Sequence, residues 1–135
     1  MKLSLALFLC VSLATAPDAD PVVAVQEIIA QQIHAFRQDD PALAYALASP
    51  ALREKFPRED AFLAMVKREY GPVYRAGSFA FGRTKIDGDA IVQEVLISGP
   101  DGKDWTALYQ LVRQPDGDYR INGVHLVATA PGPGI

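Results

Sequence analysis

The sequence offers few residues that could hold a metal or perform redox chemistry. Its 135 residues include one cysteine, Cys10, and two histidines, His34 and His125. One cysteine cannot close a disulfide within the chain, and two histidines on unrelated segments do not make a zinc site. Gly77 and Gly82 fit neither a dinucleotide-binding nor a phosphate-loop spacing, and no serine lies in a nucleophile-elbow pattern. We therefore expect no metal and no other cofactor.

An excess of positive charge and a long apolar run are also absent. Thirteen lysines and arginines face sixteen aspartates and glutamates, which gives a formal net charge of −3. Without a basic stripe the chain has little means of binding phosphates, so we expect no nucleic-acid partner. The most apolar segment, residues 3–11, is much shorter than the roughly 20 residues that span a bilayer. We therefore expect no stable membrane anchor.

The N-terminus has the pattern of a secretory signal peptide. Lys2 precedes the apolar run of residues 3–11, and residues 12–16 are mostly small. We predict a signal peptide over residues 1–16 and a periplasmic or secreted location. Cleavage after Ala14 is favoured, because cleavage after Ala16 would leave Pro17 next to the scissile bond.

Cys10 is expected to leave with the signal peptide. It lies inside the apolar run and follows Phe8 and Leu9, whereas a lipoprotein signal has small residues before the modified cysteine. Lipidation is therefore not predicted, and the exported chain would have no thiol. Residues 17–130 are predicted to form a single domain, followed by a flexible Pro-Gly tail at residues 131–135.

The first half of the chain is predicted to be helical. Apolar residues at spacings of three and four indicate a helix over residues 21–38, with shorter helices over 42–48, 50–56 and 58–69. Three of these starts combine a capping side chain with a proline, at Asp20-Pro21, Asp40-Pro41 and Ser49-Pro50. The sequence Tyr70-Gly71-Pro72 is predicted to end the helical half.

The second half alternates between apolar and polar residues and predicts four strands, over residues 74–85, 90–98, 104–113 and 119–127. The tripeptide Pro-Asp-Gly occurs at 100–102 and again at 115–117, where it suits a three-residue hairpin loop. Helices followed by an antiparallel meander indicate an α+β fold, with the helices packed on a curved four-stranded sheet.

The two Pro-Asp-Gly loops also predict which side chains share a face of the sheet. They place Gln93 opposite Tyr109, Tyr109 opposite Gly123, and Ala107 opposite His125. Polar groups that converge in an apolar hollow are the usual form of a small-molecule site. The candidate ligand-binding residues are Gln93, Tyr109, His125, Arg83 and Trp105.

Each candidate has a simpler structural explanation. Gln93 and Tyr109 could satisfy each other's hydrogen bonds, and His125 could be a core histidine bonded to the backbone. A bulge at Asn122-Gly123 would instead turn His125 outward, and His34 is predicted to face solvent. The opposite face of the sheet mixes polar and apolar residues, which suggests a homodimer contact there.

The chain resembles the DUF4864 family, within the NTF2-like (cystatin-like, SnoaL-like) superfamily. The resemblance rests on QIHAFRQDDPALAYALASP at residues 32–50, FLAMVKREYGPVYR at 62–75, QEVLISGPDG at 93–102 and DGDYRINGVHL at 116–126. It implies a cone-shaped core between the first helix and the sheet, but no established activity and no catalytic residues.

Two functions are compatible with this fold. We favour a non-catalytic exported module that binds a small apolar ligand or a protein. The alternative is a pocket enzyme of the isomerase or dehydratase type, in which His125 and Tyr109 exchange protons. The superfamily resemblance implies a carboxylate inside the cone of such enzymes, and the predicted sheet register places none there.

Overall fold

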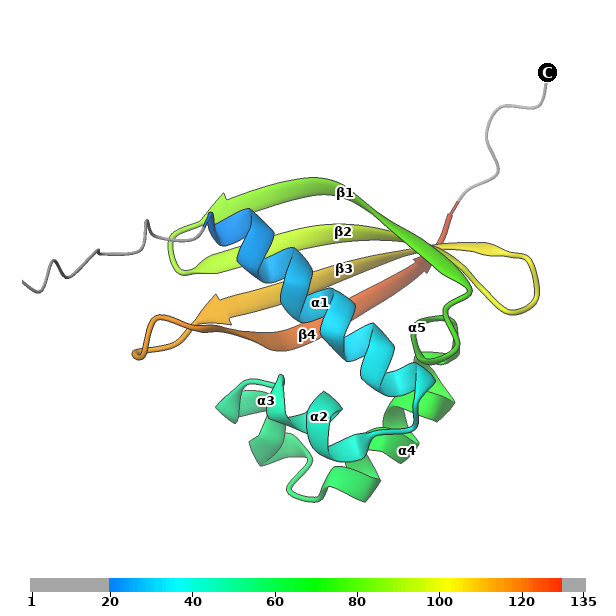
Figure 1. Cartoon of the computed structure of the whole chain (residues 1–135), viewed down its shortest axis with the longest axis horizontal. Coiled ribbons are helices and arrows are strands. Elements are labelled where there is room, and N and C mark those ends of the chain that lie inside the picture. The colour runs from blue at the N-terminus through cyan, green and yellow to red at the C-terminus, as the bar shows by residue number, and fades with distance from the viewer. Residues whose placement is uncertain (1–19, 130–135) are drawn as a thin grey trace, which may run out of the picture.

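Helices precede strands along the chain, as predicted. The computed structural model describes residues 20–129, so the predicted signal peptide (1–16) and tail (131–135) lie outside the described residues. The helices are α1 (Pro21–Arg37), α2 (Pro41–Ala46), α3 (Pro50–Lys55), α4 (Glu59–Glu69) and α5 (Gly71–Tyr74). The strands are β1 (Ser78–Asp87), β2 (Ala90–Ser98), β3 (Asp104–Arg113) and β4 (Tyr119–Ala128). Figure 1 shows α1 running across one face of the sheet, with α2, α3 and α4 grouped beside β4.

The three predicted helix caps are formed. Asp20 accepts a hydrogen bond from the Val22 amide at 2.9 Å, and Asp40 accepts one from the Leu43 amide at 3.1 Å. Ser49 Oγ accepts one from the Leu52 amide at 3.2 Å. Each cap satisfies an amide that has no partner within its helix, and the following proline has no amide to satisfy.

The chain after α4 differs from the prediction. Residues 71–74 form the short helix α5, and β1 begins at Ser78 instead of residue 74. The Tyr70 carbonyl accepts hydrogen bonds from the amides of Val73 and Tyr74, both at 2.9 Å. Pro72 was interpreted as a helix stop, but a proline is equally suited to a first helical turn, and here it starts a new helix.

The strands form one antiparallel sheet in the order β1-β2-β3-β4. Gly102 and Gly117 have φ angles of +77° and +91°, which the two Pro-Asp-Gly loops require. The predicted pairing of β2 with β3 is confirmed, including Gln93 opposite Tyr109 and Ile97 opposite Trp105.

Bulges interrupt the pairing of both outer strands. In β4, Ile121 pairs with Leu111 but Gly123 pairs with Gln110, so Asn122 is an extra residue. In β1, Phe81 pairs with Val95 but Thr84 pairs with Gln93, which leaves Gly82 and Arg83 opposite Glu94. Because side chains alternate along a strand, one extra residue moves every later side chain to the other face.

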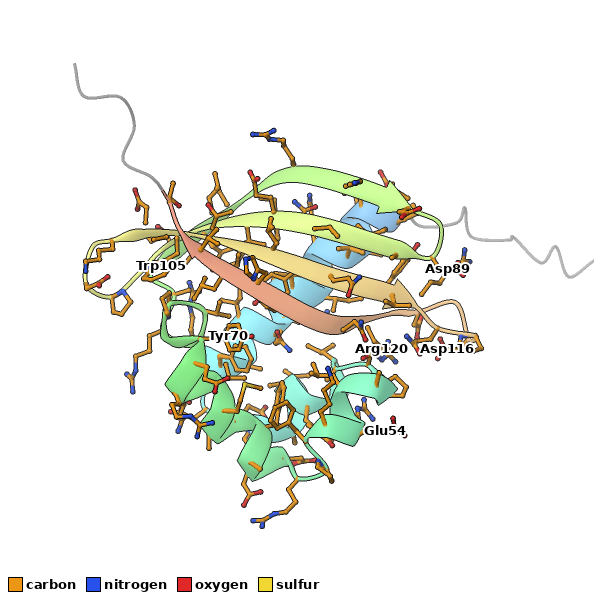
Figure 2. The ribbon with its side chains drawn as sticks, turned by 180° about the vertical axis from the view of Figure 1, so that it is seen from behind. Glu54, Tyr70, Asp89, Trp105, Asp116 and Arg120 are labelled. Carbon is orange, nitrogen blue, oxygen red and sulfur yellow. The ribbon has the colours of Figure 1, made fainter. Side chains whose placement is uncertain are left out.

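The core lies between α1 and the inner face of the sheet. Val25, Ile29 and Ile33 of α1 have no exposed surface, and neither do Val95 and Leu111 of the sheet. Figure 2 shows the outer face, with the sheet toward the viewer and α1 behind it. Between residues 20 and 129, no helix combines the length and the apolar character needed to cross a membrane.

Candidate functional site

A cavity of about 310 Å³ lies where the ends of the helices meet the middle of β4. Its wall is mainly apolar and rich in aromatic rings. The side chains and backbone that line it belong to Gln32, Phe36, Leu52, Lys55, Phe56, Phe62, Met65, Val66, Glu69, Tyr70, Val73, Ile121, Asn122, Gly123 and Val124. Figure 2 labels Tyr70, which follows α4 at this point. A mainly apolar hollow with few polar groups has the character of a small-molecule site.

Gln32 is the buried polar residue of the cavity wall. Its side chain comes from the middle of α1 and is only 2% exposed. The amide nitrogen Nε2 donates to the Ala44 carbonyl at a long 3.4 Å. Among residues 20–129, Oε1 has no hydrogen-bond partner, and it is not one of the fully enclosed polar atoms. The oxygen therefore remains able to accept a further hydrogen bond, and Gln32 lines the cavity.

The β4 bulge forms the opposite wall. Asn122 Oδ1 accepts from Ser49 Oγ at 2.8 Å, and Asn122 Nδ2 donates to Gln110 Oε1 at 3.0 Å. In the preceding residue, the Ile121 amide donates to the Leu47 carbonyl and the Ile121 carbonyl accepts from the Ser49 amide. The link between α2 and α3 is thus fixed to β4, and the extra residue is held in place by its own side chain.

Gly123, just after the bulge, lines the cavity. A Cβ added there would meet nothing within 4 Å. The sequence placed Gly123 opposite Tyr109, but the structure pairs it with Gln110. The ring expected beside it was Tyr109, which does not line the cavity.

The mouth of the cavity carries one charge of each sign. Lys55 ends α3 and Glu69 ends α4, and both side chains are exposed. The loop between these helices is held by Tyr45, whose hydroxyl donates to the Phe56 carbonyl at 2.7 Å. The Phe62 ring packs edge-on against both Tyr45 and Phe56. The aromatic part of the wall is therefore fixed before any ligand enters.

Gln93 lies on the inner face as predicted, but its polar atoms form hydrogen bonds with residues of the β1 bulge. Oε1 accepts from Thr84 Oγ1 at 2.6 Å and from Gln26 Nε2 at 3.3 Å. Nε2 donates to the carbonyls of Gly82 and Arg83, both at 3.3 Å. A buried amide with this many partners holds the strand in shape and has little capacity left for a ligand.

Tyr109 is fully buried, and its hydroxyl has no hydrogen-bond partner among the described residues. It does not bond to Gln93, although the two residues face each other across the strands. Burial raises the pKa of the Tyr109 hydroxyl far above the ordinary tyrosine value, because the interior disfavours the phenolate. Proton transfer by this hydroxyl near neutral pH is correspondingly unfavourable.

The predicted position of His125 is wrong. The structure pairs His125 with Leu108 on the outer face, where it is exposed, instead of with Ala107 on the inner face. The cause is the extra residue Asn122, which reverses the alternation from Gly123 onward. His125 and Tyr109 therefore lie on opposite sides of the sheet. His34 is exposed on α1, as predicted.

The other two candidates also lie away from the cavity. Arg83 was expected beside Gln93, but the β1 bulge places Thr84 there and leaves the Arg83 side chain exposed. Trp105 is half-buried near the loop between β2 and β3, at the other end of the sheet from Arg120 (Figure 2). The structure therefore brings Gln93 and Tyr109 together but does not gather the five residues around one hollow.

Sequence reasoning missed three polar residues of the actual cavity, Gln32, Lys55 and Glu69. The spacing of Gln32 could have indicated that it is buried. It follows Val25 by seven residues and Ile29 by three, which places it on the apolar side of α1. Lys55 and Glu69 end two different helices, and nothing in their spacing brings them to one opening. Within residues 20–129, no three His, Cys, Asp or Glu side chains form a group that could hold a metal ion.

Comparison with known proteins identifies the family. The model of a domain of unknown function, DUF4864, matches residues 18–133. No curated protein gives a significant match. Among solved structures, an NTF-2-like protein of unknown function from Silicibacter pomeroyi matches with a TM-score of 0.56 and 14% identity, over 80% of this chain and 95% of that one. An NTF2-like protein of unknown function from Shewanella baltica gives 0.55 and 12%, over 84% and 99%.

A third structure, from Catenulispora acidiphila in complex with S-DNPA, gives a TM-score of 0.50 and 18% identity, over 78% of this chain and 90% of that one. Identities this low support the fold and not a shared activity. The fold predicted from the sequence, an α+β NTF2-like architecture, is confirmed. Since the family model covers most of the sequence, the chain belongs to the DUF4864 family.

Proposed function

We propose that this protein is a non-catalytic exported module that binds one small, mainly apolar molecule in the cavity between the helices and β4. The observation that carries the proposal is the combination of an aromatic-rich hollow of about 310 Å³ with the free acceptor Gln32 Oε1 in its wall. That volume is at the lower end of the range for ligand sites, so we expect a ligand of about one or two rings. The Catenulispora acidiphila protein of the same fold, obtained in complex with S-DNPA, supports a binding role.

The chemistry of the wall favours binding over catalysis. No histidine lines the cavity among the described residues, and the carboxylate that does, Glu69, is exposed at its mouth. The alternative enzyme would need His125 and Tyr109 to reach one substrate, but these residues lie on opposite faces of the sheet. A general acid and base must both lie within hydrogen-bond reach of the reacting groups.

Gln32 further suggests that the ligand carries a hydroxyl or N–H group at its inner end. A site with an unpartnered acceptor discriminates against a ligand that cannot donate to it. We expect 4-butylphenol to bind about ten-fold more tightly than 4-butylanisole, which has the same body but no donor. Gln32→Met should abolish this preference and leave binding of the anisole nearly unchanged.

Calorimetric titration of the purified protein with these two compounds and with 1-anilinonaphthalene-8-sulfonate tests the proposal. Leu52→Trp should block the cavity and abolish binding, because Leu52 lines it. Leu43→Trp is the matched control, because Leu43 is exposed on α2 and does not line the cavity. The proposal is wrong if none of the three probes saturates, or if Leu52→Trp binds them as well as the parent protein does.

The export part of the proposal rests on the N-terminal sequence pattern. Cell fractionation should find the protein in the periplasm or medium, and cleavage after Ala14 would leave Thr15 as its first residue. Ala14→Arg should block processing, since a small residue is needed before the cut. An intact N-terminus on protein from the cytoplasm would refute export.

A further inference from the structure

The two charged side chains at the mouth of the cavity differ in their surroundings. Glu69 Oε1 lies 3.6 Å from Arg68 Nη2, so a neighbouring guanidinium already offsets the Glu69 charge. Lys55 forms no ion pair with any residue between 20 and 129. The mouth is therefore locally positive, although the chain as a whole has a formal net charge of −3.

The inner part of the cavity is lined by neutral residues. Apart from Lys55 and Glu69, every described residue of the wall is uncharged. The buried polar residue among them is Gln32. An ionic group at this depth would lose its water without gaining an opposite charge, which is costly. A ligand should therefore place a neutral end at Gln32 and any charged end at the mouth.

We infer that the ligand is an aromatic carboxylic acid, with a hydroxyl or N–H group at its inner end and a carboxylate that pairs with Lys55. The inference rests on the proposed binding function and adds the charge of the ligand to it. The rings of Phe56 and Phe62 meet at 61° in the cavity wall, and edge-to-face contacts of this kind suit an aromatic body. Hydroxyphenylalkanoic acids combine the three required features.

An ammonium ligand is the main alternative, because aromatic rings also attract cations. Among the described lining residues, its one carboxylate partner is Glu69, whose side chain is 56% exposed and lies beside Arg68. Lys55 at the same opening would repel it. The apolar walls strengthen this preference, since a cleft of low dielectric concentrates the field of its charges. The charges at the mouth therefore favour an anion.

Four probes with the same hydroxyphenylpropyl body test the inference by calorimetric titration at low ionic strength. They end in a methyl group (4-butylphenol), a carboxylate (4-(4-hydroxyphenyl)butanoate), a neutral amide (4-(4-hydroxyphenyl)butanamide) and an ammonium (4-(3-aminopropyl)phenol). We expect the butanoate to bind about three- to five-fold more tightly than the butanamide, which is the range of a partly exposed ion pair. The ammonium should bind more weakly than both. Raising the salt to about 0.5 M should reduce the preference for the butanoate, because salt screens exposed charges.

Variants of the mouth test which residue reads the carboxylate. Lys55→Gln should remove the preference for the butanoate over the butanamide. Glu69→Gln should increase it about two-fold, because it removes a carboxylate from the mouth. Lys85→Gln is the matched control, since Lys85 is exposed on β1 and does not line the cavity. The preference compares two ligands on one protein, so a general weakening of the cavity does not change it.

The outcomes separate this inference from the proposed function. If no probe binds, 4-butylphenol included, the binding function is wrong and the inference falls with it. If 4-butylphenol binds but the butanoate binds no more tightly than the butanamide, the inference alone is overturned. The same conclusion follows if Lys55→Gln keeps the preference, or if the ammonium binds more tightly than the butanoate.

Discussion

Replacing Tyr109 by phenylalanine is expected to stabilise the protein, which is unusual for a buried tyrosine. The hydroxyl is fully buried and has no partner among the described residues. Burying a hydroxyl without a hydrogen bond costs about 1–3 kcal/mol, and Tyr109→Phe removes that cost without changing the packing of the ring. At neutral pH we expect the free energy of unfolding to rise by about 1 kcal/mol, which raises the melting temperature by about 4 °C.

The same substitution should alter the stability in alkaline solution. Burial raises the pKa of Tyr109, so above the ordinary tyrosine value of 10.0 the unfolded chain loses its proton before the folded chain does. The folded state then binds more protons, and stability falls as the pH rises. Between pH 10 and 11 the parent protein should lose about 1 kcal/mol more than Tyr109→Phe does.

Tyr45→Phe is the matched control for this prediction. The Tyr45 hydroxyl donates to the Phe56 carbonyl at 2.7 Å, so its removal should lower the free energy of unfolding by about 1 kcal/mol. Urea unfolding of both variants at pH 7, and of Tyr109→Phe at pH 10 and 11, measures all the expected changes. If Tyr109→Phe destabilises the protein as much as Tyr45→Phe does, the hydroxyl has a partner and the reasoning fails.

Other substitutions test the two bulges, again by urea unfolding. Gln93→Leu should lower the free energy of unfolding by about 2–3 kcal/mol, because Thr84 and the carbonyls of the β1 bulge lose their partner. A loss below about 0.5 kcal/mol would mean that the bulge does not depend on Gln93. Asn122→Ala should cost about 1–2 kcal/mol, since it removes the bonds to Ser49 and Gln110. His125→Ala should change the free energy of unfolding by less than about 0.5 kcal/mol because His125 is exposed, and a larger loss would mean that its side chain is buried.

Local signals predicted the fold well because each acts within a few residues. A capping side chain such as Asp40 bonds to an amide three residues away, and a Pro-Asp-Gly loop fixes the pairing of the strands that it joins. The element order, the α+β class and the pairing of β2 with β3 follow from such signals. Pro72 shows their ambiguity, since the same residue is compatible with ending one helix or beginning the next.

The candidate site was predicted less well because it depends on contacts between distant residues. The β4 bulge is stabilised when Ser49, in the helical half, donates to Asn122. The β1 bulge is stabilised by Gln93 and by Gln26 of α1. The hairpin loops could not be used to predict these hydrogen bonds, because none of the residues that form them lies in a loop. The sequence pattern allowed a bulge at Asn122-Gly123 but could not choose between the two registers.

The single extra residue in β4 affects both faces of the sheet. On the side of the helices, Asn122 is held by Ser49, and Asn122 and Gly123 form part of the cavity wall. On the outer side, the reversed alternation brings His125 and Val127 to the surface, opposite the positions of Glu94 and Leu96 across β3. Without the bulge, His125 would lie on the inner face of the sheet, opposite Ala107. The wall of the cavity and the outward positions of His125 and Val127 therefore depend on the same local irregularity.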